Sequence, residues 1–334
     1  MGSNGSNKDE RVYRTILLPL DGSEAAEAVL ELAKNLAVRS GSALTLLHVC
    51  RPEQADYERL HSAYIERVAD LVQRDISKIC ETVQCHFEGV TATASPVLVK
   101  GEPAEEIVRC AEENEVSVIL MATHGRSGLV RSVMSDIANR VVRNSLVPVW
   151  LMRTLDPDDI ICAEWPPKRV LVPLDGSERA EKVLPYAAEY ARLFDAELVL
   201  MRVCEQPAIT TDYPEASMPI SWDEHVSRAR SHYKAQCSVY LEVVKDRLKE
   251  MGIKVTTEAL LGDAAEEIIG YIRQNRCDLV AMTTYGRSGM ARWVSESPVG
   301  RWVFSNVTEQ VLAATSRGIL VVRGRPTFKS EIVI

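Results

Sequence analysis

The chain has 334 residues, of which 46% are apolar and 26% charged, and its formal net charge is −8. This length is enough for two domains of ordinary size, each with its own hydrophobic core. The negative charge argues against nucleic acid or an anionic membrane as the main partner, because both are bound through excess lysine and arginine, and no apolar run is long enough to span a membrane.

Short apolar runs alternate with helical patterns along the first half of the chain. The runs that are typical of strands buried on both faces of a sheet are 13–21, 43–49, 90–99, 116–122 and 147–152. Helices are predicted between them, the first from Glu24 to about Val38 and the longest over 51–81. This alternation predicts a parallel sheet with helices on both faces, and ligands at the carboxyl ends of its strands.

The second half of the chain repeats the first. Leu20–Glu24 matches Leu174–Glu178 at an offset of 154 residues, and Gly101–Gly128 matches Gly262–Gly289 at an offset of 161. We therefore predict two copies of one fold. The predicted organisation is a disordered tail (1–11), domain 1 (12–153), a linker (154–168), domain 2 (169–325) and a C-terminal tail (326–334).

The eight cysteines contain no pair at the spacing of zinc or redox motifs. Most of them lie among apolar residues, which predicts small core side chains. Cys50 and Cys204 occupy equivalent positions in the two copies, again at an offset of 154. A reducing compartment suits this usage, so we expect a cytoplasmic protein without a metal site.

Three motifs occur in both copies, in the same order. They are [LV]-P-L-D-G-S-E on the first strand, G-[ED]-x-A-E-E-I after the third and M-x-T-[HY]-G-R-S-G on the fourth. The combination resembles the universal stress protein family, in its UspA-like tandem form. The resemblance implies a Rossmann-like α/β fold in each domain, a five-stranded parallel sheet of order 3-2-1-4-5 with helices on both faces. It also implies that the two domains pair through their fifth strands as an intramolecular pseudo-dimer. Whether two such chains also form a homodimer stays open.

Many members of this family bind ATP through the motif G-x2-G-x9-G-[ST], which runs from the fourth strand into the next helix. In domain 1 the four motif positions fall on Ala122, Gly125, Ser135 and Asp136. The spacing of nine is intact there, but two glycines are replaced and the hydroxyl becomes a carboxylate. Domain 1 therefore keeps only part of the family's phosphate loop.

Domain 2 departs from the motif in a different way. Its four positions fall on Thr283, Gly286, Ser305 and Asn306, and the spacing is stretched from nine to eighteen. The resemblance thus implies a degraded adenine-nucleotide site in each domain.

The other candidate nucleotide-binding residues come from the ends of the first and second strands. By the same matching, the family's acid on the adenine side is Asp21 in domain 1 and Asp175 in domain 2, and its base-contacting valine is Val49 and Val203. A neighbouring proline of each first strand, Pro19 and Pro173, is also a candidate. Each aspartate could equally brace the turn after its strand through hydrogen bonds to the backbone, and both interpretations stay open.

Asp136 also has two interpretations. An acid in the first turn of a helix stabilises the helix by about 0.3–1 kcal/mol, and it would occupy the N–H groups that a phosphate uses. It would also repel a triphosphate. Because Asn306 is neutral at the matching position, we expect ATP or AMP, where bound, in domain 2.

No Ser-His-Asp or Cys-His set, metal-ligand cluster or GxxxxGK[ST] motif can be assigned in the sequence. We therefore expect a stress-response module that binds or signals through adenine nucleotide, rather than an enzyme. A scaffold of the same fold that binds no nucleotide, and a slow ATP hydrolase, are the alternatives.

Overall fold

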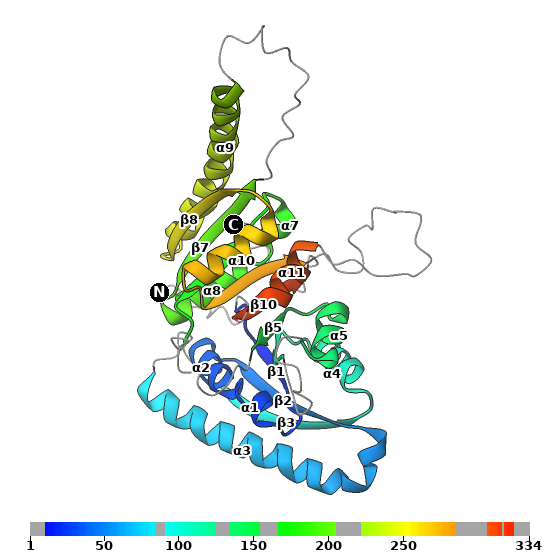
Figure 1. The fold of residues 1–334 in the computed structure, drawn as a ribbon. Coiled ribbons are helices and arrows are strands. Elements are labelled where there is room, and N and C mark those ends of the chain that lie inside the picture. The colour runs from blue at the N-terminus through cyan, green and yellow to red at the C-terminus, as the bar shows by residue number, and fades with distance from the viewer. Residues whose placement is uncertain are drawn as a thin grey trace, which may run out of the picture.

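The computed structural model describes residues 11–83, 91–123, 134–153, 166–204, 222–284, 306–315 and 317–323. The strands of this part are β1 (Thr15–Pro19), β2 (Ala43–Cys50), β3 (Thr93–Lys100), β4 (Val118–Ala122), β5 (Val149–Met152), β6 (Arg169–Pro173), β7 (Glu197–Cys204), β8 (Lys254–Leu261), β9 (Leu279–Thr284) and β10 (Gly318–Arg323). They form one sheet in the order β3-β2-β1-β4-β5-β10-β9-β6-β7-β8 (Figure 1). Each half therefore has the predicted order 3-2-1-4-5.

Helices cover both faces of this sheet (Figure 1). They are α1 (Glu24–Glu27), α2 (Leu30–Ser40), α3 (Glu58–Thr82), α4 (Pro103–Glu113), α5 (Asp136–Asn144), α7 (Glu178–Glu181), α8 (Leu184–Phe194), α9 (Trp222–Glu250), α10 (Ala264–Gln274) and α11 (Asn306–Ala314), with a 3-10 helix η1 (Pro52–Tyr57) before α3. The predicted helix from Glu24 to Val38 is thus two helices. The second of them ends at Gly41, whose φ of 66° is the left-handed conformation that glycine adopts without strain.

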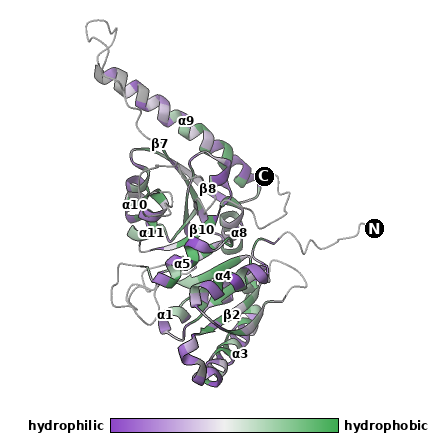
Figure 2. Ribbon diagram, turned by 90° about the vertical axis from the view of Figure 1, so that its right-hand side faces the viewer, coloured by the Kyte–Doolittle hydropathy of each residue, from purple (hydrophilic) through white to green (hydrophobic). Residues whose placement is uncertain are grey.

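Two apolar cores lie on opposite faces of the sheet. One packs α2, α3, α8 and α9 against the strands, and the other packs α4, α5, α10 and α11. Figure 2 shows the strands as largely hydrophobic and the helices as mixed, which is the pattern of a sheet buried on both faces. None of the described helices combines the length and the apolar character that crossing a membrane requires.

The two halves meet through their fifth strands, as predicted. Strand β10 pairs with β5 in antiparallel fashion, with Leu320 opposite Trp150, whereas the other strand pairs are parallel. Trp150 is 1% exposed and lies edge-on to Tyr190 of α8, with ring centroids 5.2 Å apart. One continuous sheet therefore crosses the joint, and an aromatic pair from both halves packs beneath it.

Arginines from each half close this joint in a reciprocal way. The Arg153 guanidinium, after β5, donates to the carbonyl of Leu312 at 2.9 Å, and the Arg323 guanidinium, in β10, donates to the carbonyl of Asn144 at 3.2 Å. Both carbonyls are near the last turn of a helix, where backbone oxygens lack helical partners. The symmetry of these contacts matches that of a pseudo-twofold pair of domains.

The cysteines depart from the sequence-based expectation at one place. Cys50, Cys110 and Cys277 are buried thiols, as predicted, and burial raises the pKa of Cys277 to about 11. Cys204 and Cys237, however, form a disulfide between the end of β7 and α9. The spacing rules missed this bond because they consider neighbours along the chain, whereas the fold brings together two residues 33 positions apart.

A buried ammonium group joins α2 to α3. Lys34 is only 7% exposed, and its Nζ donates to Glu31 at 2.5 Å and to Asp75 of α3 at 2.9 Å. Burial opposes its charge, but the two carboxylates outweigh burial and raise the pKa of Lys34. The contact between Lys34 and Asp75 therefore favours the charged form of both side chains.

We expect Asp75→Asn to lower the free energy of unfolding by about 0.5–1 kcal/mol at pH 7, since Asp75 is partly exposed and screened. The hydrogen bond from Lys34 lowers the pKa of Asp75. Its stabilisation is thus present above the unfolded-state pKa of about 3.9 and is lost as the pH falls. Urea unfolding at pH 7 and pH 3 measures this, with the exposed Asp70→Asn as control. A difference from wild type that persists undiminished at pH 3 would contradict the assignment.

Candidate functional site

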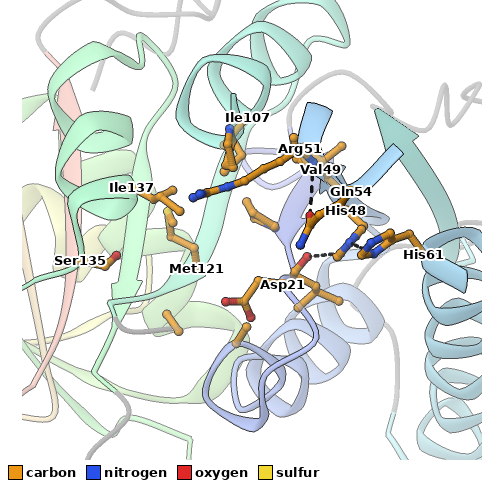
Figure 3. A pocket seen from close by; sticks show the side chains of 16 residues that line it. Asp21, His48, Val49, Arg51, Gln54, His61, Ile107, Met121, Ser135 and Ile137 are labelled. Carbon is orange, nitrogen blue, oxygen red and sulfur yellow. Dashed lines mark hydrogen bonds between the residues drawn. The ribbon is translucent and has the colours of Figure 1, made fainter. Parts of the chain in front are cut away.

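A cavity of about 330 Å³ opens at the carboxyl ends of β1, β2 and β4, where α4 and α5 begin (Figure 3). It is lined by Pro19, Leu20, Asp21, Ala26, Leu47, His48, Val49, Arg51, Gln54, His61, Pro103, Ile107, Met121, Ala122, Ser135 and Ile137. Carboxyl ends of parallel strands are where α/β sheets bind ligands. The lining is apolar with a few polar groups, as small-molecule sites are.

Asp21 braces the turn that follows β1. Its Oδ1 accepts hydrogen bonds from the backbone N–H of Ser23 at 3.0 Å and from the Ser23 hydroxyl at 2.5 Å. Ser23 in turn accepts from the N–H of Ala26 at 3.1 Å and caps α1. Asp175 makes the same two bonds to Ser177 in domain 2, at 2.9 and 2.6 Å. The turn-bracing interpretation is therefore satisfied in both domains, while each aspartate still lines its cavity.

Two histidines form one wall of the first cavity. His48 Nδ1 lies 2.7 Å from the carbonyl oxygen of Leu20, and His48 Nε2 lies 2.7 Å from Nδ1 of His61 on α3. Because a carbonyl only accepts, the first contact requires a proton on His48 Nδ1. A single proton then lies between His48 and His61. The candidate residues named from the sequence include neither histidine, because the alternation along β2 gives no indication that His48 meets His61.

The equivalent residues of domain 2 make different contacts and are not among those that line its cavity. Arg202 occupies the position of His48, and its guanidinium lies over the ring of Tyr240 at 5.0 Å. Tyr240 donates to Glu181 at 3.0 Å, as Tyr64 donates to Glu27 at 2.8 Å in domain 1. Burial, followed by the hydrogen bond to the carboxylate, raises the pKa of both tyrosines. The tyrosine–glutamate contact is thus common to both domains, whereas the residue beside the tyrosine is His48 in domain 1 and Arg202 in domain 2.

One side of the first cavity, where the family motif was matched, is formed by the end of β4 and the start of α5. Ala122 and Ser135 both line it. The N–H of Ser135 donates to the carbonyl of Thr123 at 2.8 Å, and its hydroxyl accepts from the N–H of Ala138 at 3.2 Å. Asp136 is exposed and is not among the lining residues. Its chain neighbours Ser135 and Ile137 line the cavity, whereas Asp136 itself does not. Gly125 lies outside the described residues.

Domain 2 has the equivalent cavity, of about 260 Å³. It is lined by Pro173, Leu174, Asp175, Ser177, Arg179, Ala180, Met201, Val203, Ala264, Ile268, Met282, Thr283, Thr284, Val307 and Thr308. Gly286 and Ser305 lie outside the described residues, and Asn306 begins α11 with a side chain that is not described. Sequence analysis did not anticipate Arg179 or Thr308, which come from helices.

The described residues contain no group of three histidine, cysteine or acidic side chains that could hold a metal ion. The polar groups that line the cavities suit hydrogen bonding and charge recognition. The arrangement favours binding a small polar ligand with an apolar part.

Comparison with known proteins gives a consistent result. The family model described as universal stress protein family matches residues 12–153 and 166–323. "Universal stress protein YxiE" of Bacillus subtilis is 27% identical over 148 residues, which cover 42% of this chain and all of that protein. The crystal structure of a universal stress protein from Archaeoglobus fulgidus superposes with a TM-score of 0.62 at 20% identity, over 93% of this chain and 98% of that one. A universal stress protein solved in complex with cAMP covers 43% of this chain and 98% of its own, at 19% identity and a TM-score of 0.30.

Proposed function

The chain belongs to the universal stress protein family, and from that premise we propose that it is a tandem stress-response module whose cavities bind adenine nucleotide, ATP or AMP. The observation that carries the proposal is the pair of equivalent cavities at the carboxyl ends of the strands. Both are lined by the aspartate, valine and proline that the family resemblance assigns to the nucleoside side. The same proposal takes the pseudo-dimer of its two domains as the working unit, and the cytoplasm as its location.

Within this proposal, domain 2 is the stronger ATP site. Its cavity has neutral threonines, Thr283, Thr284 and Thr308, on the phosphate side and contains Arg179. In domain 1 the carboxylate of Asp136 lies at the start of α5, beside the cavity. An anion bound at a helix N-terminus is weakened by a carboxylate already placed there. A triphosphate therefore favours domain 2.

We expect Val203→Trp to weaken ATP binding by about tenfold or more, because the indole fills the wall on which the base would pack. The same substitution in domain 1, Val49→Trp, should have a much smaller effect on ATP. Titration calorimetry of full-length proteins, after thermal unfolding has shown that both are folded, gives the comparison. The reverse order of effects would assign ATP to domain 1 instead.

Nucleotide released by heating the purified protein and identified by chromatography tests the proposal as a whole. Adenine nucleotide in the extract, or micromolar binding on titration, supports it. A protein that carries none and binds none in titration would favour the scaffold function of the same fold.

A further inference from the structure

Among the described residues that line the first cavity, Arg51 is the one arginine or lysine. It follows β2 directly, and its side chain extends into the cavity toward the wall formed by Ile107, Met121 and Ile137 (Figure 3). These three side chains are apolar, whereas Arg51 itself is an exposed residue, so solvent screens part of its charge.

No carboxylate in the described part of the chain neutralises this guanidinium. The backbone N–H of Arg51 donates to Gln54 Oε1 at 3.4 Å, but no ion pair of the described residues includes its side chain. Asp21, the acid that lines the same cavity, is held in the turn by Ser23. The cavity therefore presents an arginine fork, which suits phosphate or carboxylate oxygens.

The wall that Arg51 approaches suits a phosphate better than a carboxylate. Ser135 lines the cavity as the N-cap of α5, so its hydroxyl can donate to a phosphate oxygen. A phosphate has enough oxygens to meet both the guanidinium and this helix start. The carboxylate of Asp136 at the same helix start opposes any phosphate, and it opposes a longer phosphate chain more strongly because that chain carries more negative charge.

The repeat shows that this cation is particular to domain 1. At the offset of 154 residues, Arg51 of domain 1 corresponds to Glu205 of domain 2. Arg179 of domain 2 corresponds to Ala25 of domain 1. Arg179 lines the second cavity from α7, whereas Arg51 enters the first cavity from the end of β2. The two cavities thus carry their arginines on different walls.

We infer that Arg51 anchors the anionic group of the ligand in domain 1, and that this cavity selects a phosphate monoester, of the kind a nucleoside monophosphate carries, over a triphosphate. This inference deepens the proposed function, on which it rests, by naming the ligand class of the first cavity. Asp21 and the apolar wall then face the nucleoside part, and Arg51 faces the phosphate.

The test uses the full chain with Val203→Trp, so that binding reports the first cavity. Calorimetry with AMP, ATP, adenosine and inorganic phosphate compares this protein with versions that also carry Arg51→Gln, Arg51→Lys or Arg59→Gln. Arg59 is an exposed arginine of α3 outside the cavity, so its change removes the same charge elsewhere. We expect AMP to bind more tightly than ATP, and Arg51→Gln to weaken AMP by about fivefold to tenfold, the size of one typical net hydrogen bond.

The other arms make the inference specific. Adenosine affinity should not change in Arg51→Gln, Arg51→Lys should retain part of the AMP affinity, and Arg59→Gln should behave as its parent. Equal losses for adenosine and AMP, or no loss at all, would overturn the inference and leave the proposed function intact. If inorganic phosphate alone binds as tightly as AMP, the anchor stands and its source is free phosphate. If neither the wild type nor these variants bind any nucleotide, the proposed function fails together with the inference.

Discussion

Replacing Trp150 with alanine should lower the free energy of unfolding by about 3–5 kcal/mol, the usual loss for a fully buried tryptophan. Trp150 is 1% exposed, lies in β5 and packs edge-on against Tyr190 of the other half. The change therefore removes apolar burial and an aromatic contact across the joint between the domains. Urea unfolding followed by circular dichroism measures the loss, and a broader or two-step transition would show that the halves have become less coupled.

Two further variants separate burial from the aromatic pair. Trp150→Phe keeps an aromatic ring and should cost clearly less than the alanine change. Tyr190→Phe keeps its ring but loses the buried hydrogen bond to the carbonyl of Pro167 at 3.0 Å, worth about 1 kcal/mol. The exposed Val239→Ala on α9 serves as the control for a general loss of apolar surface. A loss below about 1 kcal/mol for Trp150→Ala would show that the joint does not depend on this packing.

Sequence analysis found the fold because both faces of the sheet are buried. Strands such as β4, VILMA, are buried at every position, so they appear as uninterrupted apolar runs. The internal repeat predicted the two-domain organisation, because the same order of strands and helices occurs twice. Details that depend on packing were missed: the split of the first helix into α1 and α2, and the disulfide between Cys204 and Cys237.

The candidate site was predictable where it depends on strand ends. Asp21, Val49 and Ala122 come from three strands whose carboxyl ends meet at one edge, and all three line the first cavity. Side chains that enter from helices and turns were not predictable in this way. His61 lines the cavity from α3, and Arg51 lines it from the residue between β2 and η1. Residue spacing does not determine that either side chain faces the cavity.

Changing Asp136 to serine together with Ala122 to glycine should raise the ATP affinity of domain 1 by roughly tenfold to a hundredfold. A carboxylate ~4 Å from a phosphate repels it by ~1 kcal/mol in water and by ~4 kcal/mol at an effective dielectric of about 20. Asp136 is exposed, so the lower part of that range applies. Ala122 is 7% exposed and lines the cavity, and removing its methyl group lets the ligand approach the backbone.

Calorimetry in the Val203→Trp background compares the two single changes and the double change, with Glu112→Gln as control. Glu112 is an exposed acid of α4 outside the cavity, so its change removes a negative charge without altering the phosphate side. If Asp136→Ser alone gives most of the gain, charge is the main obstacle to ATP in domain 1. If the double change gives no gain, the charge argument is wrong, and the family's missing glycine at Ser135 is the remaining obstacle. Adding Ser135→Gly then tests the backbone directly, at the cost of the hydroxyl that caps α5.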